Sequence, residues 1–141
     1  MIEFESVFLD TSPFIYLIEN NPKYCSIIEN FIAENIANET LFITSVITVS
    51  EFQVIPRRVN NFNPINDFEK LVNQLHFKIF DITFEIAEIS AGLRAKYGFL
   101  KSIDTIQLAV AINHKCQCFL SNDLKLKKVQ EIKIITLEDL Q

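Results

Sequence analysis

Residues 6–14 read S-V-F-L-D-T-S-P-F, and this stretch decides the fold expected for the chain. The apolar run 7–9 is typical of a strand buried in a sheet. The run ends at Asp10, and Ser12 followed by Pro13 is a helix-start signal, because serine caps helices and proline fits the first helical position. Asp10 is therefore expected at the carboxyl end of a strand, where ligands bind in open α/β sheets. A role in ending the strand and capping the helix explains Asp10 equally well.

The composition predicts one soluble, folded domain spanning residues 1–141. The chain is 49% apolar and has only 2 glycines, so we expect a substantial core and short loops. The acidic start argues against a signal peptide, and no apolar run is long enough to cross a membrane. An odd number of cysteines, with Cys116 and Cys118 too close for a mutual disulfide, favours the reducing cytoplasm.

Strand-like and helix-like segments alternate along the chain. We expect strands at 7–9, 41–43, 77–80, 118–120 and 133–136, with helices at 13–18, 23–38, after 45, 67–75, 83–97, 103–113 and 124–129. This alternation predicts an α/β fold, in which helices cover both faces of a parallel sheet of four to five strands.

Several boundaries follow from local signals. Pro56 is expected to end its helix close to Ile55, and residues 57–64 form the best loop candidate. Gly98 is expected at the C-terminal stop of the preceding long helix. The helix 103–113 is apolar on almost every side, which predicts a central position.

Four acids stand in unusual surroundings. Most of the 18 acids lie in polar stretches, but Asp10 and Asp123 end strands, Glu51 closely follows another strand, and Asp104 lies in the most apolar helix. A buried carboxylate is costly unless it is paired or bound to a metal. The helix dipole would explain Asp104 alone, at an N-terminal turn. In a parallel sheet all four can converge, and their mutual repulsion then favours a bound Mg²⁺ or Mn²⁺.

The order and setting of these acids resemble those of PIN-domain proteins, and within them the small VapC-type toxins. The matching stretches are V-F-L-D-T-S with Asp10, I-T-V-S-E-F with Glu51, L-K-S-I-D-T-I-Q-L-A-V-A-I with Asp104, and F-L-S-N-D with Asp123. The likeness spans nearly the whole chain. It implies a PIN-like three-layer α/β/α sandwich.

The resemblance also implies an activity. It is that of an endoribonuclease that depends on Mg²⁺ or Mn²⁺ and cleaves RNA by metal-activated water, as the toxin of a toxin–antitoxin pair. The implied metal-holding and catalytic residues are Asp10, Glu51, Asp104 and Asp123. Supporting residues beside them, which would orient ligands or waters, are Thr11, Ser12, Ser121 and Asn122. The implied partners are an RNA substrate, a small antitoxin protein and a second copy of the chain.

The net charge of −5 does not exclude RNA. Without the four putative ligands, 14 acids face 13 lysines and arginines, a net of −1. Basic residues are clustered near the proposed ligands, and Arg94 and Lys101 are the best candidates for RNA contacts. Ordinary solubilising surface explains each basic residue equally well.

Other readings stay open or are weaker. A PIN-fold domain that binds RNA or protein but has lost catalysis is the main alternative, whereas a receiver domain would need paired acids after the first strand. Cys116, Cys118 and His114 lack a fourth ligand in a matching setting for zinc. Three apolar residues of the first helix could contact a partner or pack in the core: Phe14, Ile15 and Ile18. Phe62 and Phe99 could stack on RNA bases, but we expect them to be buried.

Overall fold

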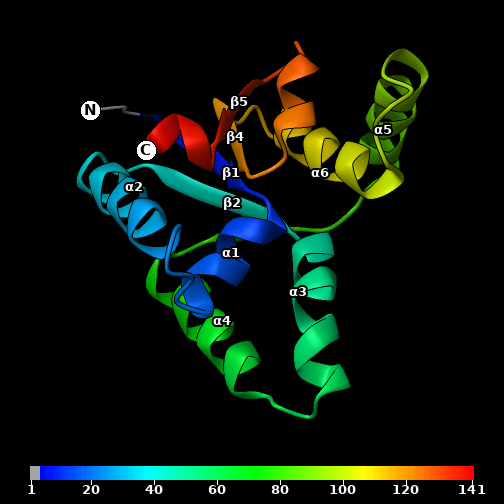
Figure 1. Cartoon of the computed structure of the whole chain (residues 1–141). Helices are drawn as coiled ribbons and strands as arrows, with labels where there is room; N and C mark the ends of the chain where they lie inside the picture. The colour runs from blue at the N-terminus through cyan, green and yellow to red at the C-terminus, as the bar shows by residue number, and fades with distance from the viewer. Residues whose placement is uncertain (1–3) are drawn as a thin grey trace.

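The structure is a computed structural model that describes residues 4–141 (Figure 1). Its centre is one five-stranded sheet in the order β3-β2-β1-β4-β5, and every neighbouring pair is parallel. The strands are β1 (Ser6–Leu9), β2 (Leu41–Ser45), β3 (Lys78–Phe80), β4 (Cys118–Ser121) and β5 (Lys133–Thr136). The predicted parallel sheet is therefore confirmed, and β1 lies in its middle.

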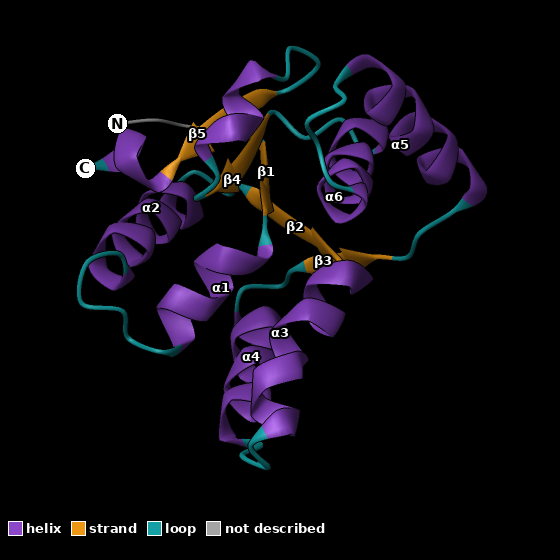
Figure 2. Ribbon diagram, turned by 45° about the vertical axis from the view of Figure 1, so that its right-hand side comes forward, coloured by secondary structure: helices purple, strands orange, loops and turns teal. Residues whose placement is uncertain are grey.

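Helices cover both faces of this sheet, as Figure 2 shows. They are α1 (Thr11–Ile18), α2 (Cys25–Ala37), α3 (Val46–Arg58), α4 (Asn63–Gln74), α5 (Phe84–Lys96) and α6 (Ser102–Asn113), with the 3₁₀ helices η1 (Leu124–Lys128) and η2 (Leu137–Leu140) near the chain end. The predicted three-layer α/β/α arrangement is confirmed.

The central strand β1 joins the two halves of the core because successive side chains point to opposite faces of a strand. Val7 and Leu9 are fully buried on the face covered by α1 to α4. Phe8 is fully buried on the face covered by α5 and α6, where its ring stacks on Phe119 with 4.9 Å between centroids. Burial on both faces fixes the register of β1 and hence the position of Asp10 directly after it.

The start of α1 differs from the prediction. Asp10, rather than Ser12, is the N-cap, because its side chain accepts a hydrogen bond from the Thr11 backbone N–H. Thr11 is the first helical residue, which places Pro13 third. A proline is tolerated throughout the first turn, since the backbone N–H groups there have no partner within the helix.

The predicted stop at Pro56 is wrong. Helix α3 continues to Arg58, and α4 already begins at Asn63, so the loop expected at 57–64 is shortened to residues 59–62. Pro56 lies in the last turn and removes one helical hydrogen bond, whereas the bonds that follow remain, such as Val59 N–H to the Ile55 carbonyl at 3.1 Å. The buried Pro56 ring adds apolar packing that offsets this loss.

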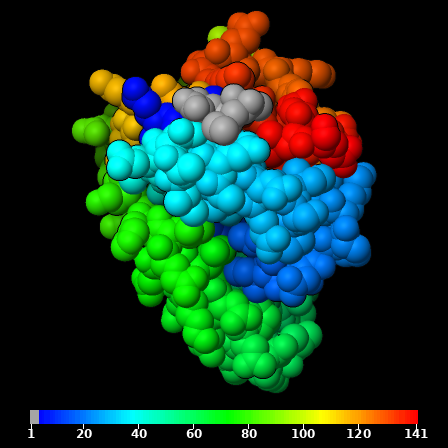
Figure 3. Space-filling model, turned by 90° about the vertical axis from the view of Figure 1, so that its left-hand side faces the viewer, coloured from blue at the N-terminus to red at the C-terminus, as the bar shows by residue number. Residues whose placement is uncertain are grey.

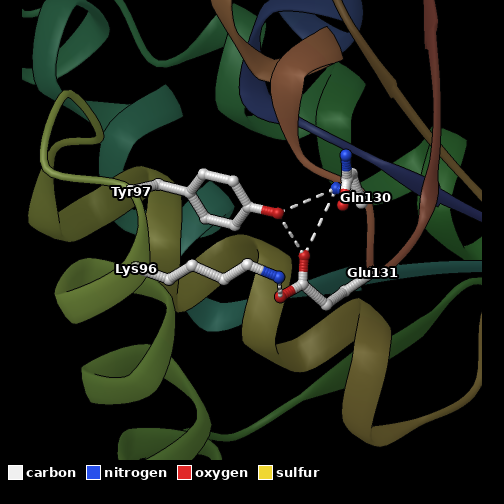
Figure 4. A network of polar contacts seen from close by, with 4 residues as sticks. All are labelled: Lys96, Tyr97, Gln130 and Glu131. Carbon is white, nitrogen blue, oxygen red and sulfur yellow. Dashed lines mark hydrogen bonds and ion pairs between the residues drawn. The ribbon is translucent and has the colours of Figure 1, made fainter.

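Helix α5 ends at Lys96 with Tyr97 as its C-cap, so Gly98 follows the helix end as predicted. Gly98 does not adopt the left-handed conformation common for a glycine at this position, and the backbone N–H of Tyr97 makes the last helical bond. The Tyr97 hydroxyl instead anchors the segment, donating to Glu131 Oε1 at 2.6 Å and accepting from the Gln130 backbone N–H at 3.1 Å (Figure 4). Lys96 pairs with the same carboxylate at 3.2 Å. This network ties the end of α5 to the segment before β5.

Other features agree with the sequence. Helix α6 is central, with Leu108 and its neighbours fully buried, and Thr83 caps α5. Phe14 belongs to the core, while Ile15 and Ile18 are partly buried against it. All three cysteines are free thiols. Within residues 4–141, no helix is long and apolar enough to cross a membrane.

Candidate active site

The carboxyl ends of β1 and β4 open into a cavity of about 580 Å³. All four acids singled out in the sequence line it, and they come from four separate places in the fold: the N-cap of α1, α3, α6 and the turn after β4. The four predicted supporting residues line it as well. The acids are Asp10, Glu51, Asp104 and Asp123, and the supporting residues are Thr11, Ser12, Ser121 and Asn122.

Asp10 is the most constrained of these acids. Its Oδ1 accepts from the Thr11 backbone N–H at 2.9 Å, and its Oδ2 accepts from the Ser121 hydroxyl at 2.8 Å. Burial nevertheless raises the pKa of Asp10 to about 6. The hydrogen bonds from Thr11 and Ser121 oppose this increase, whereas the negative charges of Glu51 and Asp104 add to it. The site thus holds a carboxylate that would gain from a nearby cation.

Glu51 is placed by α3, whose N-terminus directly follows β2. The Thr11 hydroxyl donates to Glu51 Oε1 at 2.6 Å, which joins α1 to α3 across the cavity. Ser45 caps α3 by accepting from the Ile47 backbone N–H at 3.1 Å. Capping fixes where α3 begins and so directs Glu51 toward the end of β1.

Asp104 and Asp123 form the other side of the cavity. Asp104 lies half-buried in the first turn of α6, where burial raises its pKa and the charge of Asp123 raises it further. Asp123 caps η1 by accepting from the Lys125 backbone N–H at 3.0 Å, and the Lys125 ammonium lies 4.0 Å from Asp123 Oδ2. The charges of Lys125 and Lys101 partly offset the rise at Asp104.

The buried side chain of Gln107 connects Asp10 to the interior. Its Oε1 accepts a very short hydrogen bond from the Ser45 hydroxyl, and its Nε2 donates to Thr48 Oγ1 at 2.7 Å and to Asp10 Oδ1 at 3.5 Å. Thr44 Oγ1 lies 2.8 Å from both Thr48 Oγ1 and the Leu9 carbonyl. A carbonyl can only accept, so Thr44 donates to Leu9 and Thr48 donates to Thr44. These bonds turn an N–H of Gln107 toward Asp10.

Sequence reasoning missed some of these residues. Gln107 lies in a helix that reads as apolar core, and only the fold reveals its neighbours. Tyr16 also lines the cavity, where its hydroxyl accepts from Asn122 Nδ2 at 3.1 Å. Lys125 is the lysine that lines the cavity, although the sequence favoured Arg94 and Lys101. Neither of those two lines the cavity: the charge of Lys101 lowers the pKa of Asp104, and Arg94 lies exposed on α5.

The donor set has the chemistry that a hard divalent cation requires, because it consists of carboxylates with hydroxyl and amide oxygens beside them. In residues 4–141, however, no three His, Cys, Asp or Glu side chains are gathered closely enough to hold a metal ion together. Mg²⁺ usually keeps several waters and takes only one or two carboxylates directly. The arrangement therefore fits a hydrated ion that contacts some of the acids through water.

The fold and this acidic pocket define a class of protein. The family model described as PIN domain matches residues 7–132 of the chain. That match includes all four pocket acids and the strands β1 to β4 apart from Ser6, whereas β5 lies beyond it. The chain therefore belongs to the PIN domain family.

Several solved structures share this fold. A chain of VapBC2 from Rickettsia felis, bound to a DNA fragment from the promoter, has a TM-score of 0.75 at 15% identity and covers 93% of this chain and 98% of its own. A chain of a toxin–antitoxin complex from Klebsiella pneumoniae has a TM-score of 0.64 at 23% identity and covers 93% of this chain and 97% of its own. A chain of FitAcB from Neisseria gonorrhoeae has a TM-score of 0.70 at 18% identity and covers 94% of this chain and 98% of its own. No curated protein sequence gives a significant match.

The raised pKa of Asp10 predicts that this acid lowers stability at neutral pH. Between pH 3.8 and about pH 6, Asp10 is protonated in the folded chain but ionised in the unfolded chain, so unfolding releases its proton. Its cost to stability therefore grows across this range and is complete only well above pH 6. We expect Asp10→Asn to raise the unfolding free energy by about 1–3 kcal/mol at pH 8 in chelator, and by much less at pH 4.5. Urea unfolding at the two pH values measures the difference.

Glu88→Gln is the control for this experiment, because Glu88 is an exposed acid of α5. It should leave the unfolding free energy almost unchanged at both pH values. An Asp10→Asn variant that is less stable than the wild type at pH 8 would show that the ionised Asp10 stabilises the fold.

Proposed function

We propose that the protein is an endoribonuclease dependent on Mg²⁺ or Mn²⁺, acting as the toxin of a toxin–antitoxin pair. The observation that carries this proposal is the convergence of Asp10, Glu51, Asp104 and Asp123, from four separate elements, on one pocket of a PIN fold. Membership of the PIN family and similarity in fold to toxin–antitoxin structures support the class of nuclease.

The residues that line the pocket would have separate roles in this reaction. When bound, the divalent ion supplies a water of lowered pKa and neutralises charge on the scissile phosphate. Asp10 and Asp104 would hold that ion, since their pKa values are raised in its absence and each gains from a cation. Ser121 and Thr11 keep Asp10 and Glu51 in fixed orientations by donating hydrogen bonds to them. Lys125 lines the pocket, where its positive charge would attract the phosphates of the RNA backbone.

The test of this proposal is cleavage of a mixed RNA pool by the purified protein. We expect cleavage with Mg²⁺ or Mn²⁺, none with chelator, and a loss of at least 100-fold in Asp104→Asn. This variant removes a charge without changing the shape of the side chain, so folding is retained. Product length and end groups, read by gel, measure the activity and show whether a 5′-phosphate is produced.

Glu88→Gln is again the matched control, because it removes an exposed acid outside the pocket and should cleave at the wild-type rate. Cleavage that persists in chelator or in Asp104→Asn would contradict the proposal. If the wild type cleaves nothing yet binds RNA, the PIN-fold binding domain without catalysis becomes the better description.

A partner surface accompanies the proposed toxin role. A cavity of about 480 Å³ lies between α2 and α4, and residues of α1 also line it. Figure 3 shows this hollowed face of the molecule. Its lining is mainly apolar and includes Ile18, Ile32, Ile36 and Leu71. We propose that a small antitoxin covers it, as suggested by the toxin–antitoxin assemblies among the structural neighbours. A homodimer and a cytoplasmic location remain predictions of the same proposal.

Ile36→Glu tests this surface because Ile36 is 48% exposed and its replacement should leave folding intact. If a gene beside this one encodes a small protein, the wild type co-expressed with it should purify as a stable complex and Ile36→Glu should not. The exposed Val59, the C-cap residue after α3, provides a control, since Val59→Glu adds the same charge outside the cavity. Equal recovery of both variants in complex would contradict this placement.

A further inference from the structure

We propose that Phe99, Lys128 and Lys125 form a platform that binds a single-stranded stretch of RNA beside the acidic pocket, with one base stacked on the Phe99 ring. The proposal rests on the proposed ribonuclease function and names how its substrate is held. It uses residues outside the set of acids, and only Lys125 of the three lines the pocket.

The first observation is that Phe99 is exposed yet held in place. It keeps 41% of its surface open to solvent, whereas the sequence predicted burial. Tyr97 contacts it edge-on, with 6.0 Å between ring centroids and an angle of 70° between the planes. Tyr97 is itself fixed by Glu131 and by the Gln130 backbone N–H (Figure 4). An exposed ring that is already ordered loses little entropy when a base stacks on it.

The second observation is the charge beside that ring. The Lys128 ammonium lies over one face of the Phe99 ring, 5.2 Å from the centroid, so a base would stack on the face that Lys128 leaves open. In the part of the chain that the structure describes, this ammonium forms no ion pair. Two neighbouring lysines differ, since Lys127 pairs with Asp139 at 2.5 Å and Lys96 pairs with Glu131. Lys128 therefore keeps its charge available for a phosphate.

The third observation connects the ring to the pocket. Lys125 and Lys128 are three residues apart in η1, and side chains three apart in a 3₁₀ helix lie on the same side, separated by about 6 Å along the axis. This distance is close to that between successive phosphates of a single strand. Because Lys125 lines the acidic pocket, a strand whose phosphate lies in the pocket can pass along η1 to Phe99.

An unpaired lysine, Lys128, next to an exposed aromatic face suits RNA better than a protein partner. Base stacking on aromatic rings and phosphate contacts with lysine are the two components of single-strand binding. The cavity between α2 and α4, by contrast, has a mainly apolar lining suited to a protein. The two surfaces therefore have different expected occupants.

The test is binding of a labelled, mixed-sequence single-stranded oligoribonucleotide in chelator, measured by fluorescence anisotropy on the full chain. Chelator prevents the proposed cleavage, so affinity is read alone. We expect Phe99→Ala to weaken binding by about fivefold or more, and Phe99→Trp to restore it. Lys128→Gln should weaken binding and reduce the slope of log affinity against log salt by about one.

Two matched controls accompany these variants. Phe84 is a phenylalanine of α5 that is 80% exposed, and Lys78 is an exposed lysine of β3; neither lines the pocket. Phe84→Ala and Lys78→Gln should bind RNA as the wild type does. Equal affinities of Phe99→Ala and Phe84→Ala for RNA would overturn the platform.

The outcomes separate this proposal from the proposed function. Metal-dependent cleavage by the wild type, with no change in RNA affinity in Phe99→Ala, would overturn the platform and leave the ribonuclease intact. A wild type that neither binds nor cleaves RNA would overturn both. Loss of antitoxin binding in Phe99→Ala, with RNA affinity retained, would assign this surface to a protein instead.

Discussion

The rest of the structure depends on the burial of one carboxylate at the end of the central strand. Strand β1 is fully buried on both faces, so the residue that follows it is forced to the boundary between core and pocket. Asp10 occupies that boundary, caps α1 and accepts hydrogen bonds from Thr11 and Ser121. The fold supplies donors that partly offset the cost of burial, and the remaining cost appears as the raised pKa.

Parallel pairing converts this local constraint into a site. Because β1, β2 and β4 run in one direction, the segments that follow them start at the same sheet edge. Asp10, Glu51 and Asp123 therefore converge although more than 100 residues separate the first from the last, and α6 adds Asp104 from the face opposite α3. Asp10 thus ends a strand, caps a helix and lines the pocket at the same time.

The sequence predicted the parallel sheet and the meeting of the four acids at one sheet edge because both follow from patterns that are local or periodic. The predicted helix end at Pro56 was wrong because the effect of a proline depends on its position within the helix. In the last turn only one helical hydrogen bond is lost. Gly98 follows the end of α5 as predicted, but the hydrogen bond from Tyr97 to Glu131 could not be foreseen because Glu131 is distant in sequence. Gln107 could not be recognised, since its polar partners lie on β2, α3 and the end of β1.

The central claim is that the four acids form one cation site, and crystals grown with Mn²⁺ test it most directly. Anomalous scattering from manganese would locate the ion independently of any assay. We predict a peak in the cavity with Asp10 or Asp104 as a direct ligand and the other acids in contact through water. Crystals at saturating Mn²⁺ that show no peak there, or a peak only elsewhere, would contradict the account.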